Sequence, residues 1–220
     1  MNNRKKGIII WDWNGTLLDD VDICIESMNG LLKKRNLPFL NIEKYKEVFT
    51  FPVKDYYAEV GFDFSKESFD QVAIEFIDAY RENVKRSTPF EEVKQVLQEF
   101  KNAGYRQFLI SAMEHEFLTE TLKSNDVLHF FEAFSGINDH HANGKLEMAK
   151  HFFDRQNIDP SLVSFIGDTI HDFEVAEGLG VKSVLVASGH QSISRLKKTG
   201  TIVVNELSDL LELFKLNGHV

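Results

Sequence analysis

Short apolar runs that stop at a polar residue recur along this chain of 220 residues. Residues 7–11 read Gly-Ile-Ile-Ile-Trp and end at Asp12, which is typical of a strand buried on both faces of a parallel sheet. The runs at 107–110 and 162–166 have the same character, and segments with helical periodicity lie between the runs. This alternation predicts an α/β fold with a Rossmann-like, doubly wound parallel sheet.

The second half of the chain continues the alternation. A helix start is predicted at residues 88–91, because Thr88 can cap the helix, Pro89 suits its first position and Glu91 completes a capping box. We expect this helix to end at Gly104. Further strands are expected near residue 134 and at 183–186 and 202–204, and further helices at about 116–122, 146–155 and 173–179.

The segment from about residue 19 to residue 86 contains helical patterns only. One apolar stripe begins at Val21, and a second runs from Phe69 to Tyr80. The chain should therefore leave the sheet after one strand and return to it later. We predict a helical cap domain at residues 17–87, inserted into a core domain of residues 1–16 and 88–220.

Composition excludes several kinds of partner. The formal net charge is −9, which argues against nucleic acid or an anionic membrane as a partner. The chain shows no apolar run long enough for a signal peptide or a membrane span, so a cytoplasmic protein is expected, as a monomer or homodimer. Its single cysteine, Cys24, excludes an intramolecular disulfide.

Polar residues follow the predicted strands where they end, the edge of an open parallel sheet at which ligands bind. Asp12 and Asp168 supply the hard anionic oxygens that Mg²⁺ prefers. Lys145 adds a positive charge and Ser111 a hydroxyl group, while main-chain N–H groups around Gly15 can point at an anion. Together these groups describe a site for a phosphoryl group and its metal ion.

Four segments that carry these polar residues, in their order along the chain, resemble the four motifs of the haloacid dehalogenase superfamily. Residues 12–16, Asp-Trp-Asn-Gly-Thr, match the first motif, Asp-x-Asp-Gly-Thr, apart from one position. Ser111 and Lys145 match the second and third, and residues 167–172 match the fourth, Gly-Asp-x-x-x-Asp. The helical insert is similar to the cap of the phosphoglycolate phosphatase and β-phosphoglucomutase branch.

The resemblance implies a phosphatase mechanism that depends on Mg²⁺. Asp12 would attack phosphorus and form an aspartyl phosphate. The ion would be held by Asp12, by the main-chain carbonyl of Asn14 and by Asp168, with Asp172 acting through water. The expected reaction is hydrolysis of a small phosphomonoester, a phosphorylated metabolite similar to phosphoglycolate or a sugar phosphate.

The resemblance also assigns residues to the substrate. Ser111 and Lys145 would hold the phosphoryl oxygens while charge is redistributed in the reaction. Gly15, Thr16 and Ala112 are expected to contribute to substrate binding beside them.

Asn14 stands where the phosphatases of this superfamily have a second Asp that protonates the leaving oxygen. An amide orients groups through hydrogen bonds but has no proton to give, and such acid help is typically worth about 10²–10⁴-fold. Three interpretations follow: a phosphatase with another proton source or an easy leaving group, an enzyme with different chemistry, or a phosphate- or partner-binding protein without turnover.

The different chemistry has one candidate. Phosphonatases of the superfamily also begin with Asp-Trp, lack the second Asp and use a cap lysine to form a Schiff base. Lys54, just after Pro52, lies in a comparable place, although a solvated lysine is the simpler interpretation. Dehalogenases fit less well, because Asp168 and Asp172 preserve a metal site that those enzymes do not need.

A second metal site is suggested by the acidic and histidine residues at 114–116 and 139–141. Solvated loops are the expected explanation for both stretches. Asp19, near the cap junction, has a counterpart in the superfamily but equally suits a helix N-cap.

Overall fold

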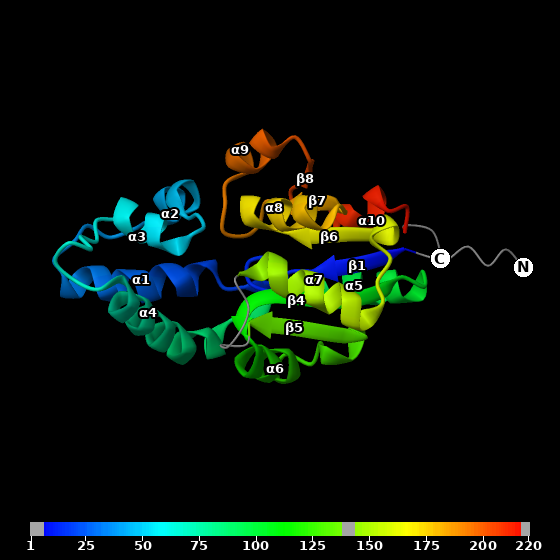
Figure 1. Cartoon of the computed structure of the whole chain (residues 1–220), viewed down its shortest axis with the longest axis horizontal. Coiled ribbons are helices and arrows are strands. Elements are labelled where there is room, and N and C mark those ends of the chain that lie inside the picture. Colours follow the sequence, from blue (N-terminus) through cyan, green and yellow to red (C-terminus); the bar gives the residue numbers. More distant parts are fainter. Residues whose placement is uncertain (1–6, 138–143, 217–220) are drawn as a thin grey trace, which may run out of the picture.

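The computed structural model describes residues 7–137 and 144–216 and contains a six-stranded parallel sheet of order β5-β4-β1-β6-β7-β8 (Figure 1). This confirms the predicted doubly wound α/β fold. The strands are β1 (Ile8–Trp11), β4 (Arg106–Glu114), β5 (Ala133–Ile137), β6 (Val163–Gly167), β7 (Lys182–Val186) and β8 (Ile202–Val204).

Strand β1 lies inside the sheet and pairs on both sides. Ile10 is in register with Phe108 of β4 on one side and with Phe165 of β6 on the other. The chain therefore adds later strands to both edges of β1, so the carboxyl end of β1 is a switch point of the topology. Ligands of open α/β sheets bind in the crevice at such a point.

The side chains of β1 alternate between two buried apolar clusters, one on each face of the sheet. Ile9 and Trp11 join the cluster that also draws on α5 (Val93–Asn102), α6 (His115–Ser124) and α10 (Asp209–Leu213). Ile8 and Ile10 join the cluster formed with α7 (Lys145–Gln156) and α8 (Ile170–Leu179). Both faces are covered, which explains why β1 is apolar throughout.

A helical insert lies beyond the carboxyl edge of the sheet (Figure 1). It has an apolar cluster of its own, in which Met28, Leu32, Tyr56 and Val72 are buried. The predicted helical excursion is therefore observed, whereas the limits of a separate cap domain at residues 17 and 87 stay a prediction. Its helices are α1 (Val21–Lys34), α2 (Ile42–Val48), α3 (Val53–Glu59) and α4 (Phe69–Asn83).

The helix predicted from residue 88 begins later, at Val93. Thr88 and Pro89 instead form β3, which pairs antiparallel with β2 (Leu18–Asp19) where the insert leaves and rejoins the core. Proline fits this two-residue edge strand because an edge position leaves its missing N–H without consequence. The predicted helix cap at Thr88 is therefore absent, because strand pairing between residues about 70 apart in sequence holds this segment extended.

Two further elements differ from the sequence prediction. Strand β4 continues past Ser111 to Glu114, with a register irregularity between Ile110 and Glu114. A short helix that the sequence did not indicate, α9 (Ile193–Leu196), follows β7.

Within the described residues, no helix combines the length and apolarity that crossing a membrane requires.

Candidate active site

Three buried carboxylates meet at the carboxyl edge of the sheet. Asp12 follows β1, Asp168 follows β6, and Asp172 lies in the first turn of α8. One oxygen from each lies within 4.8 Å of the others. The Thr16 hydroxyl donates to Asp168 Oδ1 at 2.9 Å and lies 3.5 Å from Asp12 Oδ2, so it ties two of the carboxylates together.

Asp172 is oriented by the start of its own helix. Thr169 caps α8 in a capping box, and its hydroxyl donates to Asp172 Oδ2 at 2.6 Å. The main-chain N–H groups of Asp168 and Thr169 donate to the same oxygen at 3.2 and 3.0 Å. Oδ2 is therefore occupied by these donors, and Oδ1 accepts from Lys145 Nζ at 2.6 Å, which suits an indirect role of Asp172 toward a metal ion.

Lys145, the first residue of α7, is buried against this group. Its Nζ donates to Asp12 Oδ1 and, at 2.6 Å, to Asp172 Oδ1. Burial disfavours the ammonium charge, but the carboxylates of Asp12 and Asp172 outweigh burial and raise the pKa of Lys145. Lys145 is therefore held as a buried cation at the point where the sequence predicted one.

One lysine does not neutralise three carboxylates. Burial, together with the charges of Asp172 and Asp168, raises the pKa of Asp12 to about 8. Burial also raises the pKa of Asp168 to about 6, against the opposing effect of His190. A site of hard oxygen donors that carries this excess of negative charge fits a divalent cation, so these carboxylates could hold a metal ion.

Asn14 is fixed by two residues that were not predicted from the sequence. Its Nδ2 donates to Asp20 Oδ2 at 2.8 Å and to the Tyr80 hydroxyl at 2.7 Å. The Tyr80 hydroxyl donates to the same Asp20 oxygen at 2.6 Å. Asp20 is buried, whereas Asp19 is exposed, so Asp20 is the acid that contacts the first motif at the insert junction.

His190, in the loop after β7, completes this network. Its main-chain N–H donates to Asp168 Oδ2 at 2.7 Å, and its Nε2 lies 3.4 Å from Asp20 Oδ1. Burial works against a charged imidazole, but the neighbouring Asp20 carboxylate raises the pKa of His190 to about 9. The sequence signal was available, because His190 follows the 183–186 strand at the same sheet edge.

The predicted substrate-binding residues are close to these carboxylates, with one difference. Ser111 Oγ lies 3.4 Å from Asn14 Oδ1, and exposed Ala112 lines the cavity above. Gly15 has φ +70°, and a side chain there would collide with Asp168 and His190. Its N–H donates to Leu18 O at 3.0 Å and to Asp20 Oδ1 at 2.8 Å, so it points at a carboxylate of the protein and is not free for a substrate anion.

Lys54 is not brought together with the other predicted residues. Its side chain is exposed on α3, and Nζ lies 5.9 Å from the ring centroids of both Phe64 and Phe69. Lys54 is absent from the described lining of the cavity above the carboxylates. Nothing in this geometry supports a Schiff base on that lysine.

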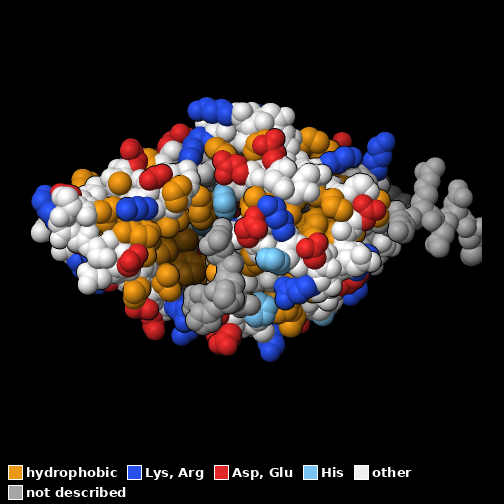
Figure 2. Space-filling model, viewed as in Figure 1, with side chains coloured by type: hydrophobic (Ala, Val, Ile, Leu, Met, Phe, Trp, Pro, Cys, Tyr) orange, Lys and Arg blue, Asp and Glu red, His pale blue; other side chains and the backbone are white. Residues whose placement is uncertain are grey.

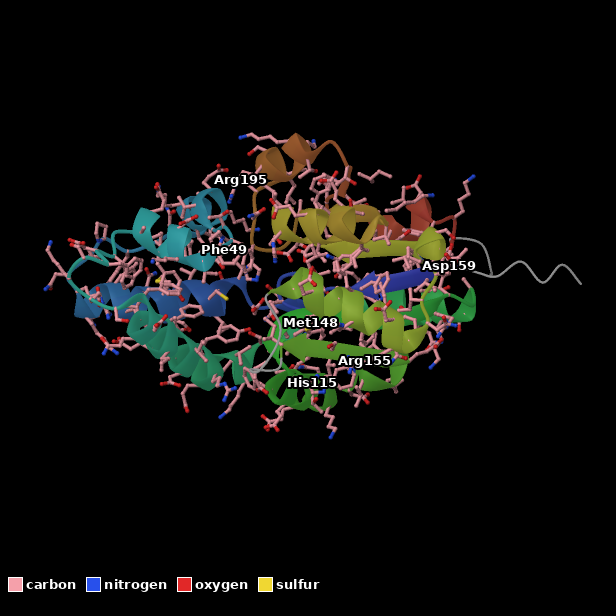
Figure 3. The ribbon with its side chains drawn as sticks, in the orientation of Figure 1. Phe49, His115, Met148, Arg155, Asp159 and Arg195 are labelled. Atoms are coloured by element: carbon pink, nitrogen blue, oxygen red, sulfur yellow. The ribbon has the colours of Figure 1, made fainter. Side chains whose placement is uncertain are left out.

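The residues considered for a second metal have other roles where they are described. The Glu114 carboxylate caps α6 by accepting from the N–H groups of Glu116 and Phe117 at 2.8 and 3.0 Å. His115 Nδ1 accepts from Gly136 N–H at 3.2 Å, between β5 and α6 (Figure 3). Asp139, His140 and His141 lie outside the described residues.

A cavity of about 420 Å³ lies over the carboxylates, between the insert and the sheet. Figure 2 shows it as a hollow lined by hydrophobic side chains. Beside it, the insert is attached to the core where Phe49 and Arg195 meet (Figure 3). Arg195 Nη1 donates to Phe49 O at 2.7 Å and to Lys46 O at 3.0 Å.

Comparisons with known proteins agree with this architecture. Residues 9–186 match the family model described as haloacid dehalogenase-like hydrolase. The chain is 25% identical to pyrophosphatase PpaX of Bacillus velezensis over 231 residues, covering 97% of this chain and 98% of the relative. It is 26% identical to phosphoglycolate phosphatase of Caulobacter vibrioides over 198 residues, covering 86% and 83% of the two chains.

A solved structure shares the fold. A haloacid dehalogenase-like family hydrolase from Streptococcus pneumoniae superposes with a TM-score of 0.76 at 19% identity, covering 95% of this chain and 98% of the other.

Proposed function

Because this chain belongs to the haloacid dehalogenase-like hydrolase family, we propose that it is a Mg²⁺-dependent phosphatase that hydrolyses a small phosphomonoester through a phosphorylated Asp12. One observation carries the proposal: three buried carboxylates and a buried lysine converge at the switch point of the sheet, below a cavity of small-molecule size. A phosphoryl group needs such an arrangement of a nucleophile, a metal site and a fixed cation.

Asp12, Asp168 and the main-chain carbonyl of Asn14 would hold the ion, with Asp172 acting through water. Bound there, Mg²⁺ supplies charge neutralisation for the phosphoryl oxygens. The raised pKa values of Asp12 and Asp168 support this assignment, because both carboxylates gain stability as anions when a cation is beside them.

In the first step, a carboxylate oxygen of Asp12 attacks phosphorus in line with the leaving oxygen. The new bond joins Asp12 to phosphorus, and the electron pair of the broken bond goes to the leaving oxygen. Lys145 and the Ser111 hydroxyl interact with the phosphoryl oxygens, whose charge the Lys145 ammonium stabilises. Asn14 orients groups at this position through its amide, which has no acidic proton.

In the second step, a water molecule attacks phosphorus, and the bond to Asp12 breaks. Inorganic phosphate is released and the carboxylate is restored. The buried position of Asp12, which is 6% exposed, protects the acyl phosphate from bulk water until a water molecule is admitted through the cavity.

A panel assay tests this proposal. The wild-type protein is offered phosphomonoesters and pyrophosphate, with Mg²⁺ or with EDTA, and released phosphate is measured. Turnover of at least one ester should require Mg²⁺ and be lost in Asp12→Asn, while the exposed neighbour variant Asp19→Asn stays near wild type. No turnover across the panel, or turnover retained in Asp12→Asn, contradicts the proposal.

A further inference from the structure

The cavity over the carboxylates is lined mainly by apolar side chains above its polar floor, and the Arg81–Glu114 ion pair and His171 also lie in its lining. Six side chains of the insert form one wall. Three come from the α2–α3 connection and the start of α3, namely Phe49, Phe51 and Val53, and three come from α4, namely Phe76, Ile77 and Tyr80. The core contributes Met113, Phe117 and Ile137 opposite them. The volume of about 420 Å³ lies within the ~300–1,000 Å³ range of small-molecule sites.

Flat rings dominate the wall nearest the carboxylates. Phe51 stacks on His171, with ring centroids 4.7 Å apart and an interplanar angle of 26°. Phe49 meets Phe51 edge-on at 5.5 Å. An aromatic ring in the cavity would have aromatic side chains to pack against, and such pairs are favourable in offset-stacked and edge-on arrangements.

Cations that line the cavity already have acidic partners, as far as the described residues show. Arg81 is paired with Glu114 at 3.1 Å and lies 5.0 Å from the Phe117 ring centroid. Lys145 is paired with Asp12 and Asp172. The imidazoles of His171 and His190 lie 3.5 and 3.4 Å from Glu174 and Asp20. Among the described residues, a second anionic group on the substrate, such as a carboxylate or another phosphate, therefore meets no spare positive charge.

The floor of the cavity constrains the leaving group independently. Both N–H bonds of the Asn14 amide are used, toward Asp20 and Tyr80. This amide cannot protonate a departing oxygen. A leaving group that is stable as an anion avoids that requirement, and a phenolate is far more stable than the alkoxide of glycolate or a sugar.

We propose that the substrate is the phosphate ester of a small phenol, with its ring in this apolar cavity and its phosphoryl group at Asp12. The inference rests on the proposed phosphatase function and deepens it. The phosphorus–oxygen bond breaks as the Asp12–phosphorus bond forms, and the phenolate leaves with the electron pair and takes a proton from solvent. Water then releases inorganic phosphate, so the products are one phenol and one phosphate.

Inhibition by phosphonates tests the cavity separately from leaving-group reactivity. Benzylphosphonate carries an apolar ring, phosphonoacetate carries a carboxylate in place of it, and neither has a phosphate ester to cleave. Inhibition constants are measured for both against turnover of the best substrate of the panel, with inorganic phosphate as the reference. The inference predicts that benzylphosphonate binds at least roughly 10-fold more tightly than phosphonoacetate.

Two isoleucines of α4 provide a matched pair of variants. Ile77 lines the cavity and is 50% exposed, whereas Ile74, which is 59% exposed, is not part of the lining. Ile77→Ser should raise the inhibition constant of benzylphosphonate by roughly three- to ten-fold and leave that of inorganic phosphate unchanged. Ile74→Ser should change neither constant.

The outcomes separate this inference from the proposed function. Equal or tighter inhibition by phosphonoacetate overturns the inference, as does an equal effect of Ile77→Ser on benzylphosphonate and on phosphate. Phosphatase activity that favours phosphoglycolate, a sugar phosphate or pyrophosphate over phenyl phosphate in kcat/KM also overturns it, while the phosphatase function stands. The absence of any Mg²⁺-dependent turnover by the wild-type protein refutes the phosphatase function itself.

Discussion

Replacing Asn14 by Asp is the substitution on which the structure makes its most detailed prediction. The Asn14 Nδ2 atom lies 2.8 Å from Asp20 Oδ2, so the substitution places two carboxyl groups in contact. Burial favours the neutral form of Asp20, but the charge of His190 and hydrogen bonds from His190, Tyr80 and Asn14 outweigh burial and lower the pKa of Asp20. The new carboxyl at position 14 therefore faces an anion.

The magnitude follows from Coulomb's law. Two unit charges 2.8 Å apart interact by about 6 kcal/mol at an effective dielectric constant near 20. The charge of His190 beside Asp20 offsets part of this repulsion. We therefore expect a pKa of roughly 6–8 for the new carboxyl, about 2–4 above the ordinary value near 3.9. Such a group is partly protonated at neutral pH and suits a general acid.

The assay compares alkyl and aryl phosphates. Asn14→Asp should raise kcat/KM for an alkyl phosphate by up to roughly 10²-fold, because the new acid protonates the alkoxide. An activated aryl phosphate should change much less, because its leaving group needs no proton. Asn102→Asp, an exposed substitution with the same charge change, should leave both rates unchanged.

An unchanged ratio of alkyl to aryl rates in Asn14→Asp would refute this reasoning about position 14. Mass spectrometry of the wild-type protein before and after the assay detects deamidation at Asn14-Gly15, which would otherwise generate the variant spontaneously.

Three further predictions follow from the site and its surroundings. Because the pKa values of Asp12 and Asp168 are raised to about 8 and about 6, protons compete with the metal for these carboxylates. The Mg²⁺ affinity measured by calorimetry should therefore fall as the pH drops from 8 to 6. An affinity that does not change over that range contradicts the metal assignment. Arg195→Ala removes two hydrogen bonds to the insert, so hydrogen exchange at residues 46–49 should become faster than in wild type or in the exposed control Arg155→Ala. Lys54→Ala should leave phosphatase activity within about two-fold of wild type, and borohydride treatment of the wild-type protein with a phosphonoaldehyde should trap no adduct on Lys54. Such an adduct would support the phosphonatase alternative.

The fold and the carboxylate site were predictable because they depend on local patterns. Apolar runs identified the buried strands, and polar residues at strand ends must share one edge of a parallel sheet. Asp12, Ser111 and Asp168 were located in this way, and the resemblance supplied the expected roles. Lys145 begins its helix one residue before the predicted start.

The surroundings of Asn14 could not be predicted in the same way. Tyr80 belongs by its spacing to the apolar stripe of its helix, yet its hydroxyl group contacts Asn14 and Asp20, 66 and 60 positions earlier in the chain. His190 meets Asp20 only because the insert docks on the loop after β7. Such contacts are set by tertiary packing, which no local periodicity encodes, and the same pairing over distance displaced the predicted helix start at Thr88.

Direct detection of the phosphorylated intermediate tests the central claim, that Asp12 carries the phosphoryl group. The wild-type protein is mixed with Mg²⁺ and an excess of phenyl phosphate radiolabelled in its phosphoryl group, quenched in acid within milliseconds and separated from free phosphate. We predict label on the protein that hydroxylamine removes, that borohydride reduction maps to residue 12, and that is absent from Asp12→Asn. Rapid turnover without protein-bound label, or label retained in Asp12→Asn, would contradict the account.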